Sequence, residues 1–191
     1  MAAYGAGIMP AQFVFYVAGI LCVGWLLLNP GRITSLLAKL YLSLAFTWNG
    51  VAFYFTLARG MAGDSYGNYV IGSVFMFVSV LFVVDLFRQR MRFSLPAFGW
   101  RRHATWVLTL LVFGYPLFGR ALGRDVTSLL FPGAFPCPTT ALGLLLLTTA
   151  LPQVDRTIYV LLLLCAIPFT PFVQIARHGV YEDVILLGRC L

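Results

Sequence analysis

The most informative pattern along the chain is a series of long apolar runs, separated by short segments that hold most of the charged residues. Apolar runs of about 17 to 25 residues have the length of a helix that crosses the hydrocarbon core of a bilayer. Four runs approach or reach this length, at residues 11–28, 33–57, 69–87 and 104–118, the last only just long enough. The pattern predicts four helices that cross a membrane.

Two further apolar runs are interrupted by proline. The fifth lies between Pro138 and Pro152, and a helix of that length would rise only about 20 Å against a hydrocarbon core of about 30 Å. The stretch before it, 125–136, contains more proline and glycine, so we expect this connection to dip into the membrane, where protein or a water-filled cavity must satisfy its backbone. The sixth run, 158–175, holds two prolines in its second half, which should break or kink it.

The end of the sequence, 179–191, is apolar but short, and two carboxylates lie near its start. We expect an interfacial or half-membrane helix there. The predicted fold is therefore all-α, a polytopic transmembrane helix bundle of about six helices with a short or broken fifth helix. The length of 191 residues suits a single transmembrane domain spanning 1–191.

The composition supports this class of fold. Hydrophobic residues make up 61% of the chain and charged residues 10%, whereas soluble domains have about 45 to 50% and about 25%. The net charge of +7 comes from residues between the apolar runs rather than from one face, so we expect the lipid bilayer as a partner and no nucleic acid. Because the first charged side chain is Arg32, the N-terminal run is not expected to be a removable signal peptide.

The basic residues also predict an orientation, because Lys and Arg are enriched on the cytoplasmic side. The first, third and fifth connections hold eight of them, and the opposite side holds five. The eight are Arg32, Lys39, Arg88, Arg90, Arg92, Arg101, Arg102 and Arg156. We therefore expect the N-terminus outside, and we expect Asp85 to pair with Arg88, three positions further along the same helical face.

Polar and helix-breaking residues gather toward the predicted outer side. Short or proline-interrupted membrane helices are a pointer to a binding site, because their free backbone groups become ligands. We predict an outward-facing polar pocket, whose candidate residues are Asn49, Tyr115, Cys137, Thr139, Thr140, Gln174, Glu182 and Asp183. The alternative for Asn49 is helix packing, since small residues share its face and interhelical hydrogen bonds in membranes contribute about 0.6 kcal/mol.

The segment Pro136-Cys137-Pro138-Thr139-Thr140 is the most distinctive. A cysteine held ahead of a helix N-terminus favours a thiolate, which binds soft cations. In the alternative, Pro138 is the first helical residue and the threonines satisfy free N–H groups. The candidate metal ligands are Cys137, Glu182 and Asp183, although adjacent carboxylates at an interface are commonly solvated. No cofactor is expected, and the absence of hydrolase, metalloprotease and P-loop motifs favours a protein that is not an enzyme.

Five short motifs carry a resemblance to a known family. In chain order they are Pro10-Ala11-Gln12, Trp48-Asn49-Gly50, Tyr115-Pro116, the Pro-Cys-Pro-Thr-Thr segment and Glu182-Asp183. Together they resemble the uncharacterised bacterial polytopic membrane family known as domain of unknown function 6064. That family usually has Thr before Pro-Cys-Pro-Thr and Phe shortly after it, whereas here Phe135 precedes the motif and Ala141-Leu142 follow. The resemblance implies a bacterial inner-membrane protein and carries no activity.

The leading hypothesis from the sequence is a small channel or transporter, for a small neutral solute or a cation, with the outward pocket as its binding site. Chains of this size often line pores as homo-oligomers. The alternative is a non-catalytic structural or accessory subunit of a larger membrane complex, which would present a wide outer face of small residues and little cavity. A third hypothesis, a membrane enzyme with Cys137 as nucleophile, requires a base near that thiol.

Overall fold

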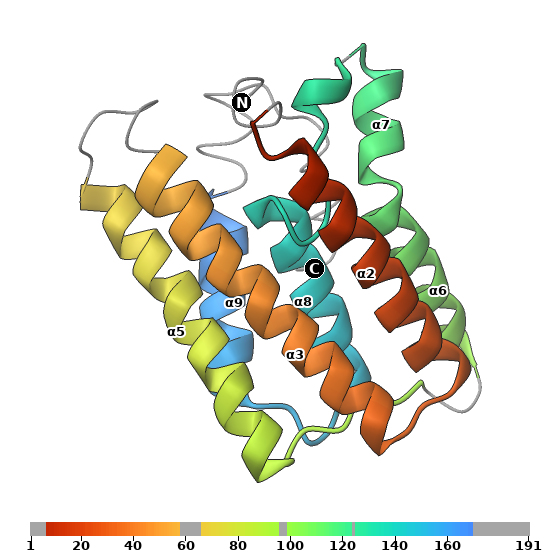
Figure 1. Cartoon of the computed structure of the whole chain (residues 1–191). Helices are drawn as coiled ribbons and strands as arrows, with labels where there is room; N and C mark the ends of the chain where they lie inside the picture. Colours follow the sequence, from red (N-terminus) through yellow and green to blue (C-terminus); the bar gives the residue numbers. More distant parts are fainter. Residues whose placement is uncertain (1–6, 58–65, 96–98, 124, 170–191) are drawn as a thin grey trace.

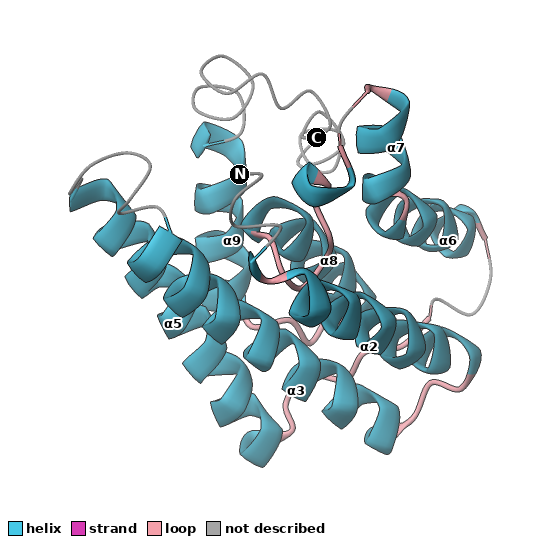
Figure 2. Ribbon diagram, turned by 45° about the horizontal axis from the view of Figure 1, so that its top comes forward, coloured by secondary structure: helices cyan, strands magenta, loops and turns pink. Residues whose placement is uncertain are grey.

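The computed structural model describes residues 7–57, 66–95, 99–123 and 125–169, and every regular element in that part is helical (Figure 2). The α-helices are α2 Met9–Leu28, α3 Arg32–Trp48, α5 Tyr66–Arg88, α6 Trp100–Phe113, α7 Tyr115–Ala121, α8 Pro136–Thr149 and α9 Arg156–Phe169. A π-helix, η1 Asn49–Leu57, continues α3, and a short 3-10 helix, η2 Val126–Ser128, follows α7. The prediction of an all-α fold is confirmed for these residues.

The first three predicted spans are confirmed as long apolar helices. They are α2, the continuous α3–η1 helix over Arg32–Thr56, and α5, each long and apolar enough to cross a membrane. α2 ends at Leu28, with Asn29 as its C-cap, just before Pro30, which cannot continue a helix. The sequence therefore located these three helices to within a few residues.

The fourth predicted helix, 104–118, is two helices rather than one. α6 and α7 meet at Gly114 with a bend of 55°. Pro116, the second residue of α7, has no N–H for the carbonyl of Val112, and its ring would clash with that carbonyl in a continuous helix. Within its described residues the protein thus has three helices that could span a membrane, or four if the bent pair counts as one span, and the number of about six stays a prediction.

The fifth predicted helix is short, as expected, but it begins two residues earlier. Its first residue is Pro136, not Pro138, so both prolines lie in the first turn. Twelve of its 14 residues are buried, and the loop before it, 129–135, is buried as well. In Figure 1, α8 starts below the upper ends of α7 and of the helix formed by α3 and η1. The predicted irregular connection therefore runs inside the helix bundle.

α3 packs along α5, and one serine joins them. The Ser79 hydroxyl donates to the carbonyl oxygen of Ser43 at 2.8 Å and lies 3.0 Å from the Ser43 hydroxyl and 2.7 Å from that of Thr47. Such hydrogen bonds between membrane helices supply specificity where the hydrophobic effect is weak. α3 and α5 are thereby fixed to each other in the middle of their length.

The three connections predicted to be cytoplasmic meet at one end of the bundle, the lower end of Figure 1. The Ser94 N–H donates to the carbonyl of Thr149 at 3.2 Å, and the Phe93 N–H donates to the Ser35 hydroxyl at 3.2 Å. The expected pair of Asp85 with Arg88 is wrong: the carboxylate pairs with Lys39 on α3 at 2.7 Å. Asp85 is buried toward α3, whereas Arg88 is exposed.

Candidate binding site around the start of helix α8

A buried hydrogen-bonded cluster joins η1, the buried loop and α8. The Asn49 side-chain amide donates to the carbonyls of Ala45 at 2.7 Å and Gly133 at 3.0 Å, and it lies 3.3 Å from the Thr139 hydroxyl. That hydroxyl accepts the Gly133 N–H at 2.9 Å and donates to the Phe135 carbonyl at 2.5 Å. Asn49 and Thr139, both predicted pocket residues, are therefore brought together across 90 positions of sequence.

Gly133 makes this cluster sterically feasible. Its φ of +89° is a conformation that residues with a side chain rarely adopt. A Cβ there would also lie 2.5 Å from the Tyr41 hydroxyl oxygen. Only glycine lets both backbone groups of this residue face Asn49 and Thr139.

Two buried polar atoms next to the cluster have no hydrogen-bond partner within the described part of the chain. They are the Asn49 side-chain carbonyl oxygen and the Trp48 indole N–H. A buried polar group without a partner costs about 1 to 3 kcal/mol, so such atoms commonly mark an interaction with something small and polar. They lie where α3 changes to a π-helix, a feature that is frequent at functional sites.

The start of α8 offers few donors to an anion. Pro136 and Pro138 have no backbone N–H, and the Thr139 N–H donates to the Phe135 carbonyl at 3.2 Å. Anion binding at a helix N-terminus depends on several N–H groups that point at the ligand. The sequence of this turn therefore disfavours an anionic ligand and leaves neutral molecules and cations.

A cavity of about 230 Å³ lies on another side of the same helix start. Side chains from η1, α5, α8 and α9 form its wall, which is mainly apolar. The lining residues are Tyr54, Ile71, Val74, Phe75, Pro136, Cys137, Thr140, Leu161, Leu164, Cys165 and Ala166. Among these lining residues, polar side chains come only from a tyrosine, a threonine and two cysteines, and none is charged.

Helix geometry explains why the predicted pocket residues divide into two groups. Cys137 and Thr140 are three positions apart and share one face of α8, which lines the cavity. Thr139 points to a different side and contacts Asn49. Tyr115 does not line the cavity and is fully buried in the hydrophobic core at the start of α7.

The remaining predicted residues, Gln174, Glu182 and Asp183, lie outside the described residues. Of the candidate metal ligands, only Cys137 is therefore placed, and the described part of the chain holds no group of three His, Cys, Asp or Glu suited to a metal ion. Sequence reasoning missed Tyr54 and Cys165 as lining residues. No local pattern in the sequence marks either residue.

The fold and the site define a class of protein: one that is helical throughout its described residues, with several apolar helices that could cross a membrane and a buried loop that leads into α8. The chain belongs to the family of unknown function DUF6064, whose family model matches residues 1–191. The resemblance inferred from the short motifs is thus confirmed. A search of curated proteins and a search of solved structures each give no match.

Proposed function

We propose that the protein is a small transporter or channel and that the cavity between η1, α5, α8 and α9 is its solute-binding site. The observation that carries this proposal is the position of α8, a 14-residue helix that begins inside the bundle and contributes three residues to the cavity wall. Helices that begin at membrane depth are a recurring way to build a substrate site in transporters. In this proposal the chain lies in a bacterial inner membrane with its N-terminus and cavity facing outward.

The chemistry of the wall favours a small neutral solute. The lining carries no charge, and a charged ligand would lose its hydration without gaining an ion pair. The volume of about 230 Å³ is below that of cavities for drug-sized ligands, which limits the solute to a small molecule. Two thiols in the cavity lining, Cys137 on α8 and Cys165 on α9, also favour a soft metal ion as the cation to test, because thiolates are soft ligands.

The alternative, a non-catalytic subunit of a larger complex, predicts a broad outer face of small residues. α2 is the helix with the most exposed surface among the three long ones, and its outer face carries Phe13, Val14, Val17, Leu21, Trp25 and Leu28. Bulky apolar side chains of this kind suit contact with lipid chains rather than close packing of helices. The proposal of a solute site therefore takes precedence.

The test is thiol labelling in oriented membrane vesicles. With Cys22 and Cys190 changed to serine, only the two cavity thiols remain. We expect a membrane-impermeant thiol reagent to label Cys137 and Cys165 from the outer side only. Short alcohols, short amides and Cd²⁺ are the probes, and a solute that occupies the cavity should slow the labelling of both thiols to the same extent.

A pair of variants separates cavity occupation from indirect effects. Ala166 is buried and lines the cavity, whereas Ile167, the next residue, is exposed on the outside of α9. Ala166→Phe should fill part of the cavity and abolish protection by the solute, and Ile167→Phe should leave protection unchanged. If neither thiol reacts from either side, the cavity is closed to solutes and the subunit hypothesis replaces this one.

A further inference from the structure

A non-helical segment, 89–95, runs across the end of the bundle opposite the α8 N-terminus, and we refer to it as the strap (Figure 1). Its side chains alternate between buried and exposed. Met91 and Phe93 are 1% and 2% exposed. Arg90 and Arg92, the residue before each of them, are exposed. This period of two is that of an extended chain with one face against a core, so the strap covers this end of the bundle with an apolar inner face and a basic outer face.

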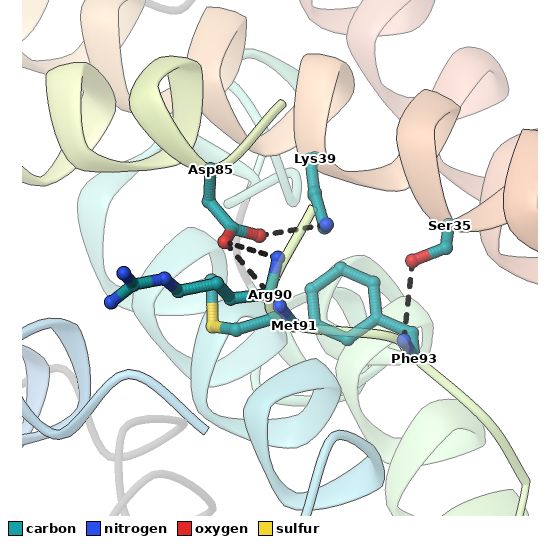
Figure 3. Close-up of polar contacts among 6 residues, drawn as sticks. All are labelled: Ser35, Lys39, Asp85, Arg90, Met91 and Phe93. Carbon is teal, nitrogen blue, oxygen red and sulfur yellow. Dashed lines mark hydrogen bonds and ion pairs between the residues drawn. The ribbon is translucent and has the colours of Figure 1, made fainter. Parts of the chain in front are cut away.

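A buried ion pair holds the first half of the strap. One oxygen of the Asp85 carboxylate accepts the backbone N–H groups of Arg90 at 3.1 Å and Met91 at 3.3 Å, and the other oxygen lies 2.7 Å from the ammonium of Lys39 on α3 (Figure 3). The strap leaves α5 at Gln89, whose φ of +50° is unfavourable for a residue with a side chain. The bonds to Asp85 therefore hold a turn that the local backbone does not favour.

Single hydrogen bonds hold the second half of the strap to two other helices. The Phe93 N–H donates to the Ser35 hydroxyl on α3, and the Ser94 N–H donates to the carbonyl of Thr149 at the end of α8. The Ser94 side chain is exposed. A segment held by a few bonds of this kind can open locally while the helices around it stay folded.

Buried aromatic rings lead from the cavity toward the strap. Phe75 lines the cavity, and its ring packs against that of Phe46 with 5.4 Å between the centroids. The Phe46 ring in turn stacks on that of Phe82 at 5.9 Å, and Phe82 is less than one helical turn before Asp85. A solute that moved from the cavity to the end of the bundle predicted to face the cytoplasm would have to pass these rings and then the strap.

We propose that the strap is the inner gate of the solute path and that this structure shows it closed. The inference rests on the proposed solute site, which supplies the outer part of the path. In the closed position Met91 and Phe93 fill the inner end of the bundle; when the strap is released, they withdraw and leave space into which the aromatic rings can turn. Transporters expose a fixed site to one side at a time through such gates.

The experiment uses the full chain in oriented vesicles and compares Ser35→Ala with Ser43→Ala. Both serines are buried on α3, but the Ser35 hydroxyl accepts a bond from the strap, whereas that of Ser43 contacts α5. The first readout is hydrogen exchange at the amides of Arg90 and Met91, whose own acceptor is intact in both variants. We expect Ser35→Ala to speed this exchange about fivefold, as the loss of one hydrogen bond predicts, and Ser43→Ala by less than about twofold.

The second readout is labelling of the two cavity thiols from the inner side, with the other two cysteines changed to serine. We expect Ser35→Ala to admit a membrane-impermeant thiol reagent from that side and Ser43→Ala not to admit it. Ser94→Pro removes the other N–H that holds the second half of the strap, at an exposed position. It should act in the same direction as Ser35→Ala in both readouts.

The possible failures of the gate and of the solute site are distinguishable. Unchanged exchange at Arg90 and Met91 in both Ser35→Ala and Ser94→Pro would overturn the proposal, because the strap would not open as a unit. Faster exchange without labelling from the inner side, while the thiols still react from the outer side, would overturn the gate and leave the solute site intact. If the thiols of the unmodified chain react from neither side, the solute site itself fails, and the gate with it.

Discussion

Replacement of Lys39 by methionine should destabilise the protein strongly. Methionine keeps most of the length of the side chain but removes the ammonium that lies 2.7 Å from Asp85. Asp85 is 6% exposed, and its carboxylate would keep only its two backbone donors. Removing one partner of a buried ion pair costs about 3 to 5 kcal/mol, because the other charge stays buried without compensation.

The size of the expected effect follows from the length of the chain. Each kcal/mol lowers the melting temperature by about 2 to 4 °C in a protein of 150 to 250 residues. Lys39→Met should therefore lower it by about 6 to 20 °C. The assay is thermal unfolding of the detergent-solubilised protein, followed through the fluorescence of its tryptophans.

Two further variants decide whether the ion pair is the cause. Lys39→Met combined with Asp85→Asn leaves a neutral side chain that still accepts the N–H groups of Arg90 and Met91, so most of the loss should be recovered. Arg88→Met, which removes the neighbour three positions along α5, should change the melting temperature by no more than about 2 °C. The reasoning is refuted if Arg88→Met is as harmful as Lys39→Met, or if the double variant is no better than the single one.

Three other predictions concern the centre of the bundle. Asn49→Leu leaves the Gly133 carbonyl and the Thr139 hydroxyl with fewer donors, so denaturant titration should give a loss of about 1 to 3 kcal/mol; an unchanged midpoint would contradict the role of the cluster. Gly133→Ala forces a Cβ against the Tyr41 hydroxyl and should lower the melting temperature, and Tyr41→Phe should restore part of the loss if that overlap contributes. Ser79→Ala removes the hydrogen bonds between α3 and α5; at about 0.6 kcal/mol per bond, calorimetry should show a small decrease, and an increase would count against these bonds.

The sequence located the long helices well, because a long apolar run can be recognised without knowing which other helices it contacts. The prediction of one continuous helix failed where a single residue interrupts an apolar run. The run at 104–118 continues through Gly114 and Pro116, yet the missing N–H of Pro116 divides it into α6 and α7. The same limit applies to α8, where either proline could open the helix and only the structure selects Pro136.

Contacts between distant segments could not be predicted from the sequence, for a different reason. Arg88 was the local partner for Asp85 by helical spacing, but Lys39 on another helix is the actual one, and nothing in one sequence reveals which faces oppose each other. For the candidate site, the sequence predicted Asn49, Cys137, Thr139 and Thr140 among its pocket residues, and this stays a prediction. Their division between a hydrogen-bonded cluster and a cavity depends on the rotation of α8, which the apolar pattern leaves undefined because nearly all of this helix is buried.

The walls of the cavity are held with unequal strength. α8 is tied to η1 through Asn49 and Thr139, and α3 is tied to α5 through Ser79. In the described residues of α9, the side-chain hydrogen bonds are those at its own start, from the N–H groups of Thr157 and Ile158 to Asp155. Apolar contacts alone hold the rest of this wall, and such contacts allow helices to slide. If the cavity is a solute site as proposed, we therefore expect α9 to be its most easily displaced wall.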